Sequence, residues 1–219
     1  MRRLAGKRIV LTLFLAFTVT VALALGATAA TSAVELSSKG SGVGETTLGS
    51  LVADAIRSQV KAEVGFVTAS ELKDTVIPAG QVSAEDVARA ITYRNDPVVV
   101  LTLRGEQVRR ALERSVAIYP QKNLGFLQVS GLSFTFDPSK PRESRVVSKM
   151  VGAKPIEDSK QYSVAATNSL ANGALGYFRV WGKDEIRSVT KTTVAQAADN
   201  YLKAQPKIEI AKGRITAAK

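Results

Sequence analysis

The sequence predicts an α+β fold, a single domain in which a mixed β-sheet is flanked by helices. The clearest sign is the stretch GFLQVSGLSFTFD, residues 125–137, where apolar and polar residues alternate from Leu132 onward as in a strand with one buried face. A second sign is the continuous apolar run Pro97–Leu103, typical of a strand buried on both faces. A third is the apolar spacing of three and four residues within Thr47–Glu63, which predicts an amphipathic helix.

Further elements follow from the same patterns. In order, the sequence predicts a helix over Thr47–Glu63, a strand over Val64–Val67, a short helix within Gln81–Thr92, a strand over Pro97–Leu103, a helix over Glu106–Ala117, strands over Phe126–Val129, Leu132–Asp137, Arg145–Val151 and Gln161–Thr167, a short strand within Trp181–Val189, and a helix over Thr193–Gln205. Thr46 or Thr47 can cap the first helix, and Ser83 with Asp86 forms a capping-box pattern. Pro206 ends the last helix, so we expect residues 206–219 to form a frayed basic tail.

The N-terminal segment has the pattern of a secretory leader. Residues 1–30 combine a basic start with the apolar run Ile9–Leu25, and Ala27–Ala29 offers a small-residue cleavage site. An uncleaved N-terminal anchor is the alternative, because the apolar run is at the short end of a membrane span. Both interpretations, a cleaved leader and an uncleaved anchor, predict a chain that is secreted, periplasmic or in the cell envelope. The chain would contact a membrane only through this segment, if it stays uncleaved. Residues 31–44 are small and polar and predict a flexible linker before the domain, residues 45–205.

The composition limits the chemistry available to the chain. Its 219 residues include no Cys and no His, which excludes disulfides, thiolate metal sites and histidine-dependent catalysis within this chain. Basic residues are in excess, with 30 Lys and Arg against 19 Asp and Glu, but they are scattered. Because no basic stripe is interleaved with aromatic residues, we expect no nucleic-acid partner.

Four segments carry a resemblance to a known family. They are GFLQVSGLSFTFDP from Gly125, ETTLGSLVADAIR from Glu45, the run from Asn95 through Leu103 into the next helix, and NSLANGALGY over Asn168–Tyr177. Together they resemble the C-terminal, substrate-specificity domain of the 5′-nucleotidase and UDP-sugar hydrolase family, whose members dephosphorylate nucleotides. The resemblance spans about residues 45–204 and does not include the family's N-terminal metallophosphatase domain, which holds the catalytic metals.

The resemblance implies where a ligand would bind. In the family, the aromatic residue of the first motif, here Phe126, is one of two rings that stack on the nucleotide base. The loop of the last motif closes over base and sugar, and here contributes Asn172, Gly173 and Tyr177. Tyr177 would serve either as a replacement ring or as a core residue. Lys73 keeps a positive charge in a loop where the family holds its ligand with Asn and Arg, so we expect it to meet an anionic group.

This chain also departs from the family pattern. Ser169 stands where the family has its second stacking aromatic residue, which forfeits about 1–3 kcal/mol of base stacking. Leu175 stands where the family has an Asp that contacts the ribose. The segment Tyr93-Arg94-Asn95 stands where the family has a P-F-x-N pattern.

We therefore expect a secreted, stand-alone binding domain that is not an enzyme on its own. The sequence assigns no catalytic residue, no metal ligand and no cofactor, and the expected partner is a nucleotide-like ligand or another protein. Two alternatives stay open. The chain would act as a subunit of a nucleotide phosphohydrolase if it assembles with a separate metallophosphatase chain, or it would be a purely structural envelope domain if side chains fill its former cleft.

Overall fold

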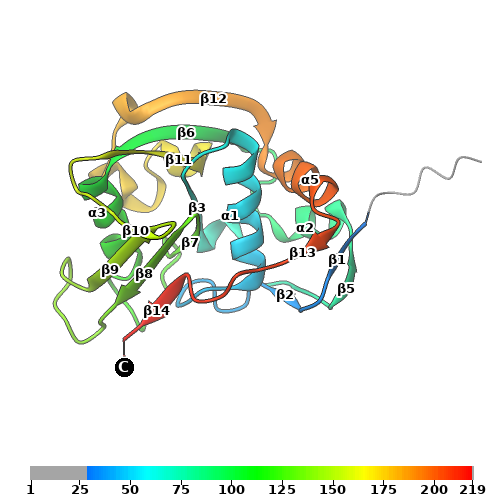
Figure 1. The fold of residues 1–219 in the computed structure, drawn as a ribbon, viewed down its shortest axis with the longest axis horizontal. Helices are drawn as coiled ribbons and strands as arrows, with labels where there is room; N and C mark the ends of the chain where they lie inside the picture. The colour runs from blue at the N-terminus through cyan, green and yellow to red at the C-terminus, as the bar shows by residue number, and fades with distance from the viewer. Residues whose placement is uncertain (1–28, 219) are drawn as a thin grey trace, which may run out of the picture.

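The computed structural model describes residues 29–218, with a five-stranded sheet at its centre (Figure 1). Its strands are, in spatial order, β12 (Ile186–Thr193), β6 (Pro97–Arg104), β11 (Gln161–Thr167), β3 (Val64–Thr68) and β7 (Leu127–Ser130). β11 pairs parallel with β3, and the other neighbours are antiparallel. This mixed sheet, covered by helices, confirms the predicted α+β class.

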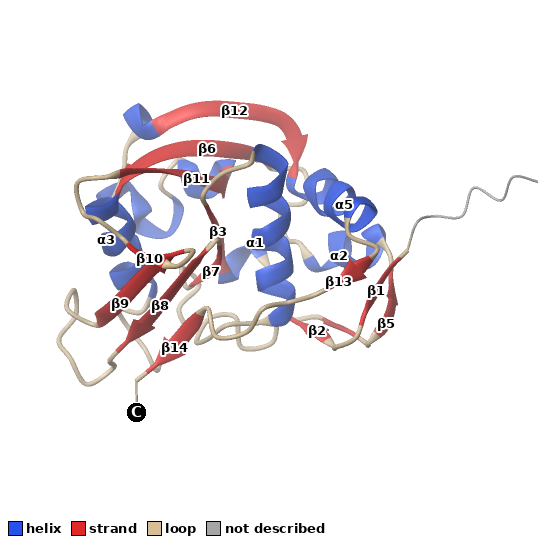
Figure 2. Cartoon of the chain, in the orientation of Figure 1, coloured by secondary structure: helices blue, strands red, loops and turns tan. Residues whose placement is uncertain are grey.

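Helices cover both faces of the central sheet (Figure 2). One face carries α1 (Thr47–Val60), α2 (Ala84–Ala90) and α5 (Val194–Ala204), and the other carries α3 (Gly105–Ser115). Neighbouring residues of one strand belong to opposite cores, as Phe66 and Val67 do in β3. Strand β6 has the same arrangement, which explains why its sequence is apolar without interruption.

The aromatic stretch that begins at Gly125 is divided between two sheets. After β7, Gly131 adopts a positive φ of 67°, and a Cβ there would lie 2.1 Å from the carbonyl oxygen of Glu63. The chain then enters β8 (Leu132–Phe136), whose alternating burial confirms the predicted one-sided strand. Strand β8 belongs to a second sheet of order β10-β9-β8-β14, which closes the α3 side of the core. Its other strands are β9 (Val146–Val151), β10 (Lys154–Pro155) and β14 (Ile215–Ala217).

The predicted linker, residues 31–44, is packed rather than flexible. Strand β1 (Ala30–Ser32) lies between β5 (Gly80–Val82) and β13 (Lys207–Ile208), and β2 (Leu36–Ser37) pairs with β4 (Val76–Ile77). Leu36 and Ser38 are fully buried, and the Ser38 hydroxyl accepts a hydrogen bond from the Thr75 amide at 2.9 Å. Small polar residues had suggested a linker, but here they pair with distant strands. Residues 1–28 of the predicted leader lie outside the described residues.

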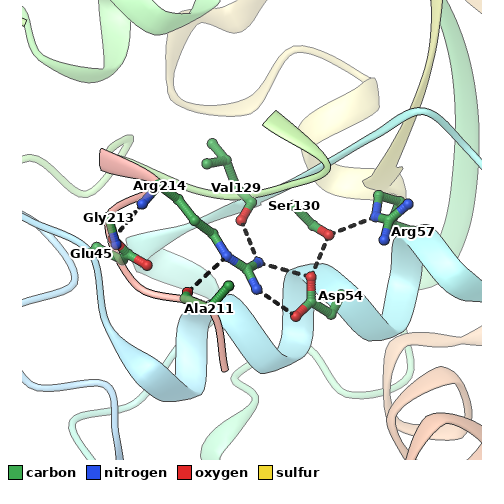
Figure 3. A network of polar contacts seen from close by, with 8 residues as sticks. All are labelled: Glu45, Asp54, Arg57, Val129, Ser130, Ala211, Gly213 and Arg214. Atoms are coloured by element: carbon green, nitrogen blue, oxygen red, sulfur yellow. Dashed lines mark hydrogen bonds and ion pairs between the residues drawn. The ribbon is translucent and has the colours of Figure 1, made fainter. Parts of the chain in front are cut away.

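The C-terminal segment is likewise bound to the domain, although we expected a frayed tail. Besides forming β13 and β14, it inserts Arg214 against α1 (Figure 3). The Arg214 guanidinium makes two 2.8 Å bonds to the buried Asp54 carboxylate and a third, of 2.9 Å, to the Val129 carbonyl oxygen. Asp54 also accepts from the Ser130 hydroxyl, which in turn accepts from the Arg57 Nε at 2.7 Å. Through these bonds to α1 and β7, Arg214 anchors the C-terminal segment to the domain.

Candidate functional site

Two predicted ligand loops leave the central sheet at the same edge. Because β3 and β11 are parallel neighbours, their carboxyl ends lie together, and each continues into a short helical turn. These turns are η1 (Ala69–Glu71) and α4 (Asn168–Ala171). The Glu71 carboxyl joins them, since it accepts from the Thr68 amide at 2.6 Å and from the Thr167 hydroxyl.

Glu71 is the most strongly perturbed acid at this edge. Its side chain is 3% exposed, and burial raises its pKa from 4.5 to about 7. The hydrogen bonds from Thr167 and Thr68 oppose this rise, and the nearby Asp96 carboxylate adds to it. The carboxyl under the two loops therefore changes its protonation near neutral pH.

A third segment, residues 92–96, completes the edge. The Thr92 amide donates to the Glu71 carbonyl oxygen at 2.8 Å, and the segment closes as a turn in which the Asp96 amide donates to Tyr93 at 2.9 Å. The Asp96 carboxylate accepts from the backbone amide of Ser169 at 2.8 Å. This bond links the turn directly to the loop that begins at Asn168.

Helix α5 holds the same turn from behind. Its first two amides, those of Val194 and Ala195, donate to the carbonyl oxygens of Asp96 and Arg94 at 2.9 and 3.0 Å. These amides would otherwise be unsatisfied at a helix N-terminus. The turn is thereby fixed on three sides, by η1, α4 and α5.

A pocket of about 380 Å³ lies between the turn and the last loop. It is lined by Thr92, Tyr93, Arg94, Asn95, Asp96 and Ser169. The Tyr93 side chain is 54% exposed, an unusual state for an aromatic ring. We did not predict a role for Tyr93 from the sequence. The available signal was an aromatic residue among polar neighbours, directly before a buried strand.

The two aromatic residues that we did single out lie in the core. Phe126 is 1% exposed, so a base would reach its ring only if the core opened. Tyr177 is fully buried, its hydroxyl donates to the Gly125 carbonyl oxygen at 2.7 Å, and its ring stacks on Trp181 with centroids 5.0 Å apart. The Tyr177 hydroxyl thus ties the last loop to the residue that precedes Phe126, and neither buried ring offers a free face to a ligand.

The three remaining predicted residues are nearer the surface or in the loop itself. Lys73 is exposed, and its backbone amide donates to Ala90 at 2.8 Å, which places it beside the segment that leads to Tyr93. Asn172 is exposed, and its side-chain amide donates to the carbonyl and side-chain oxygens of Asn168 at 2.8 and 3.0 Å. Gly173 is buried with a φ of 85° and begins η2 (Ala174–Arg179).

In residues 29–218, no group of three or more acidic side chains is placed to hold a metal ion. None of the helices in that range combines the length and the apolar character needed to cross a bilayer.

Comparison with known proteins places this architecture in a family. Residues 25–182 match the family model described as 5′-nucleotidase, C-terminal domain. The structure is similar to that of a 5′-nucleotidase precursor from Thermus thermophilus, with a TM-score of 0.77 and 27% sequence identity, covering 87% of this chain and 39% of that one. An apyrase from Aedes albopictus is 28% identical over 146 residues, which is 61% of this chain and 26% of the apyrase. A 5′-nucleotidase from Homo sapiens is 29% identical over 115 residues, 49% of this chain and 20% of that protein.

This chain therefore matches only a minor part of each of these longer relatives, between 20% and 39% of their length. The family model, in contrast, matches well over half of this chain, and its range contains the central strands β3, β6, β7 and β11. The likeness to the Thermus thermophilus structure extends over most of the described fold. The chain belongs to the family of the 5′-nucleotidase C-terminal domain.

Proposed function

We propose that this chain is a binding domain for a nucleotide-like ligand, with the base stacked on Tyr93. The observation that supports this most directly is the exposed Tyr93 ring in a pocket that Ser169, from the predicted ligand loop, also lines. A pocket of about 380 Å³ is within the size range of small-molecule sites, roughly 300–1,000 Å³. Stacking on an aromatic face suits any base, because every base has a π-face.

The polar groups around Tyr93 suit the rest of such a ligand. Arg94 and Asn95 line the pocket and can donate hydrogen bonds to a base or sugar. Lys73, exposed beside the segment that leads to Tyr93, would meet an anionic group such as a phosphate. Asn172 and Gly173 belong to the loop that starts at the pocket, and the Asn172 amide would exchange its bond to Asn168 for one to the ligand.

We further propose that binding occurs outside the cytoplasm and without catalysis by this chain alone. The leader-like pattern of residues 1–30 supports the location. The absence of His from the sequence supports the non-catalytic role, since His is the most frequent general acid and base in enzymes.

Isothermal titration with adenosine, AMP and UDP-glucose tests the proposal. Replacing Tyr93→Ala should raise the Kd about fivefold or more, because base stacking contributes about 1–3 kcal/mol. Val189→Ala is a matched control, since Val189 is equally exposed at 54% and lies on β12 outside the pocket. Lys73→Ala should weaken AMP more than adenosine.

The variants Tyr93→Ala and Phe178→Ala distinguish between two places where the ligand could bind. Phe178 is a second exposed ring, 66% accessible, at the end of the last loop. If Phe178→Ala abolishes binding while Tyr93→Ala does not, the ligand lies elsewhere. If none of the three compounds gives heat, the nucleotide proposal fails.

Two other functions have some support. Burial of Phe126 and Tyr177 favours a purely structural envelope domain, which predicts no ligand heat and a melting temperature unaffected by nucleotides. The names of the relatives, apyrase and 5′-nucleotidase, favour assembly with a separate metallophosphatase chain. Release of phosphate from AMP only after such a chain is added would support the assembly.

A further inference from the structure

A second and larger pocket lies on the opposite side of the fold from α5, over helix α3. It has a volume of about 500 Å³, and it is lined by Arg109, Arg110, Glu113, Arg114, Ala117, Arg142, Glu143, Arg179 and Val180. The basic side chains come from three places: helix α3, the loop between β8 and β9, and the end of η2. Five guanidinium groups therefore converge on one hollow, against two carboxylates.

Two of these five guanidinium groups are held by neutral partners. Arg110 donates to the Arg179 carbonyl oxygen, and Arg114 donates to the Leu175 carbonyl oxygen through its Nε at 2.8 Å. These bonds orient the side chains without cancelling their charge. Among the described residues, Arg110, Arg114, Arg142 and Arg179 have no carboxylate within 4.0 Å.

The two carboxylates of the pocket offset only part of the charge of its five guanidinium groups. Glu113 is 4% exposed and accepts from the backbone amides of Arg145 and Val146 at 3.0 and 2.9 Å, so it fixes the β8–β9 loop. Glu143 lies in that loop at a φ of 68° and forms no ion pair with the described residues. Arg109 contacts Asp158 only at 3.6 Å, and Lys149 shares that carboxylate at 3.4 Å.

We propose that this pocket, lined by α3, the β8–β9 loop and η2, is a binding site for an oligophosphate group. Guanidinium forks match phosphate oxygens and bind them bidentately, so five of them can pair with more oxygens than the four of a single phosphate group. A solvated basic surface would leave its arginines spread over the exterior instead of converging from three elements. This site does not depend on the Tyr93 pocket, because the two share no lining residue.

Isothermal titration with sodium tripolyphosphate tests the site. We expect its Kd to be at least about tenfold lower than that of orthophosphate, since the longer anion offers oxygens to more of the five guanidinium groups. The double variant Arg110→Gln/Arg142→Gln should raise the Kd about tenfold or more. Both residues are exposed, so the melting temperature should not change. The control Lys183→Gln/Lys191→Gln removes the same charge from exposed positions outside the pocket and should leave the Kd within about twofold.

ATP distinguishes a free oligophosphate from the triphosphate of a nucleotide. If the pocket recognises phosphate groups alone, ATP binding there should survive Tyr93→Ala and weaken in the arginine double variant as tripolyphosphate does. The proposal is overturned if tripolyphosphate gives no heat, if orthophosphate binds equally well, or if the lysine control loses as much affinity as the arginine variant.

Discussion

Glu71→Gln should remove a pH dependence of stability that arises from the buried Glu71 carboxyl between η1 and α4. The Glu71 side chain is buried, and burial raises its pKa from 4.5 to about 7. A glutamine has the same shape, can still accept from the Thr68 amide and can hydrogen-bond the Thr167 hydroxyl, so the local structure should persist.

The sign follows from proton binding. Between pH 4.5 and about 7 the folded protein keeps a proton on Glu71 that the unfolded chain has released, so the native state binds more protons. The free energy of unfolding contributed by this group is fully present below pH 4.5 and is lost as the pH rises through 7. A shift from 4.5 to about 7 corresponds to a loss on the order of 3 kcal/mol, at 1.36 kcal/mol per unit.

Urea unfolding at pH 5, 6, 7 and 8, followed by the fluorescence of Trp181, measures this effect. Trp181 is the chain's one tryptophan and is 3% exposed, so its emission reports global unfolding. Relative to the wild type, Glu71→Gln should gain on the order of 3 kcal/mol as the pH rises through this range. Glu209→Gln, at an exposed position, serves as the control and should run parallel to the wild type. The reasoning is refuted if the free energy of unfolding of Glu71→Gln changes with pH in parallel with that of the wild type. It is also refuted if the variant loses stability relative to the wild type as the pH rises.

Two further predictions concern stability. Arg214→Ala leaves Asp54 buried without its partner and should lower the free energy of unfolding by about 3–5 kcal/mol in urea titrations. The control Lys207→Ala removes an exposed ion pair and should lower it by less than about 1 kcal/mol. Equal losses in the two variants would contradict the role of Arg214 as an anchor. Gly173→Ala adds a Cβ 2.6 Å from the Phe178 Cβ at a φ of 85° and should lower the free energy of unfolding by at least about 2 kcal/mol. The control Gly152→Ala, where φ is 57° and the space is open, should lower it by about 1 kcal/mol, as measured by thermal melting.

The elements that the sequence predicted are those whose pattern is local. The alternation in β8 and the capping box at Ser83 arise from residues within a few positions of one another, and both are present in the structure. Each of these signals needs no knowledge of distant partners. These local patterns were sufficient to predict the fold class, because the longest strands and helices show them.

The ends of the domain were mispredicted because their structure depends on distant residues. Strands β1 and β13 have three and two residues, too few to show a period. They become strands by pairing with each other, and β1 also pairs with β5. Arg214 gave no sign of burial in the sequence, since its partner Asp54 lies 160 positions away on α1. A basic residue in a polar segment is typically solvated, and only the folded chain shows the exception.

The candidate site was only partly predictable for a related reason. The sequence identifies Phe126 and Tyr93 as aromatic, but burial is a property of the assembled sheets. Phe126 precedes β7 and lies in the core, whereas Tyr93 lies in a turn that α5 holds at the surface. A motif position therefore indicates which segments meet at the site, and exposure decides which ring a ligand can use.

The edge where β3 and β11 end couples the loops of the Tyr93 pocket to one another. Glu71 accepts from the Thr167 hydroxyl through its carboxyl and from the Thr92 amide through its backbone, so one residue contacts the start of both pocket segments. The hydrogen bond from the Ser169 amide to the Asp96 carboxylate joins the two pocket segments directly. Since Asp96 also raises the pKa of Glu71, the charge on one acid affects the other. These bonds fix the backbone that carries the exposed Tyr93 ring, and the base stacking that we propose needs a ring held in this way.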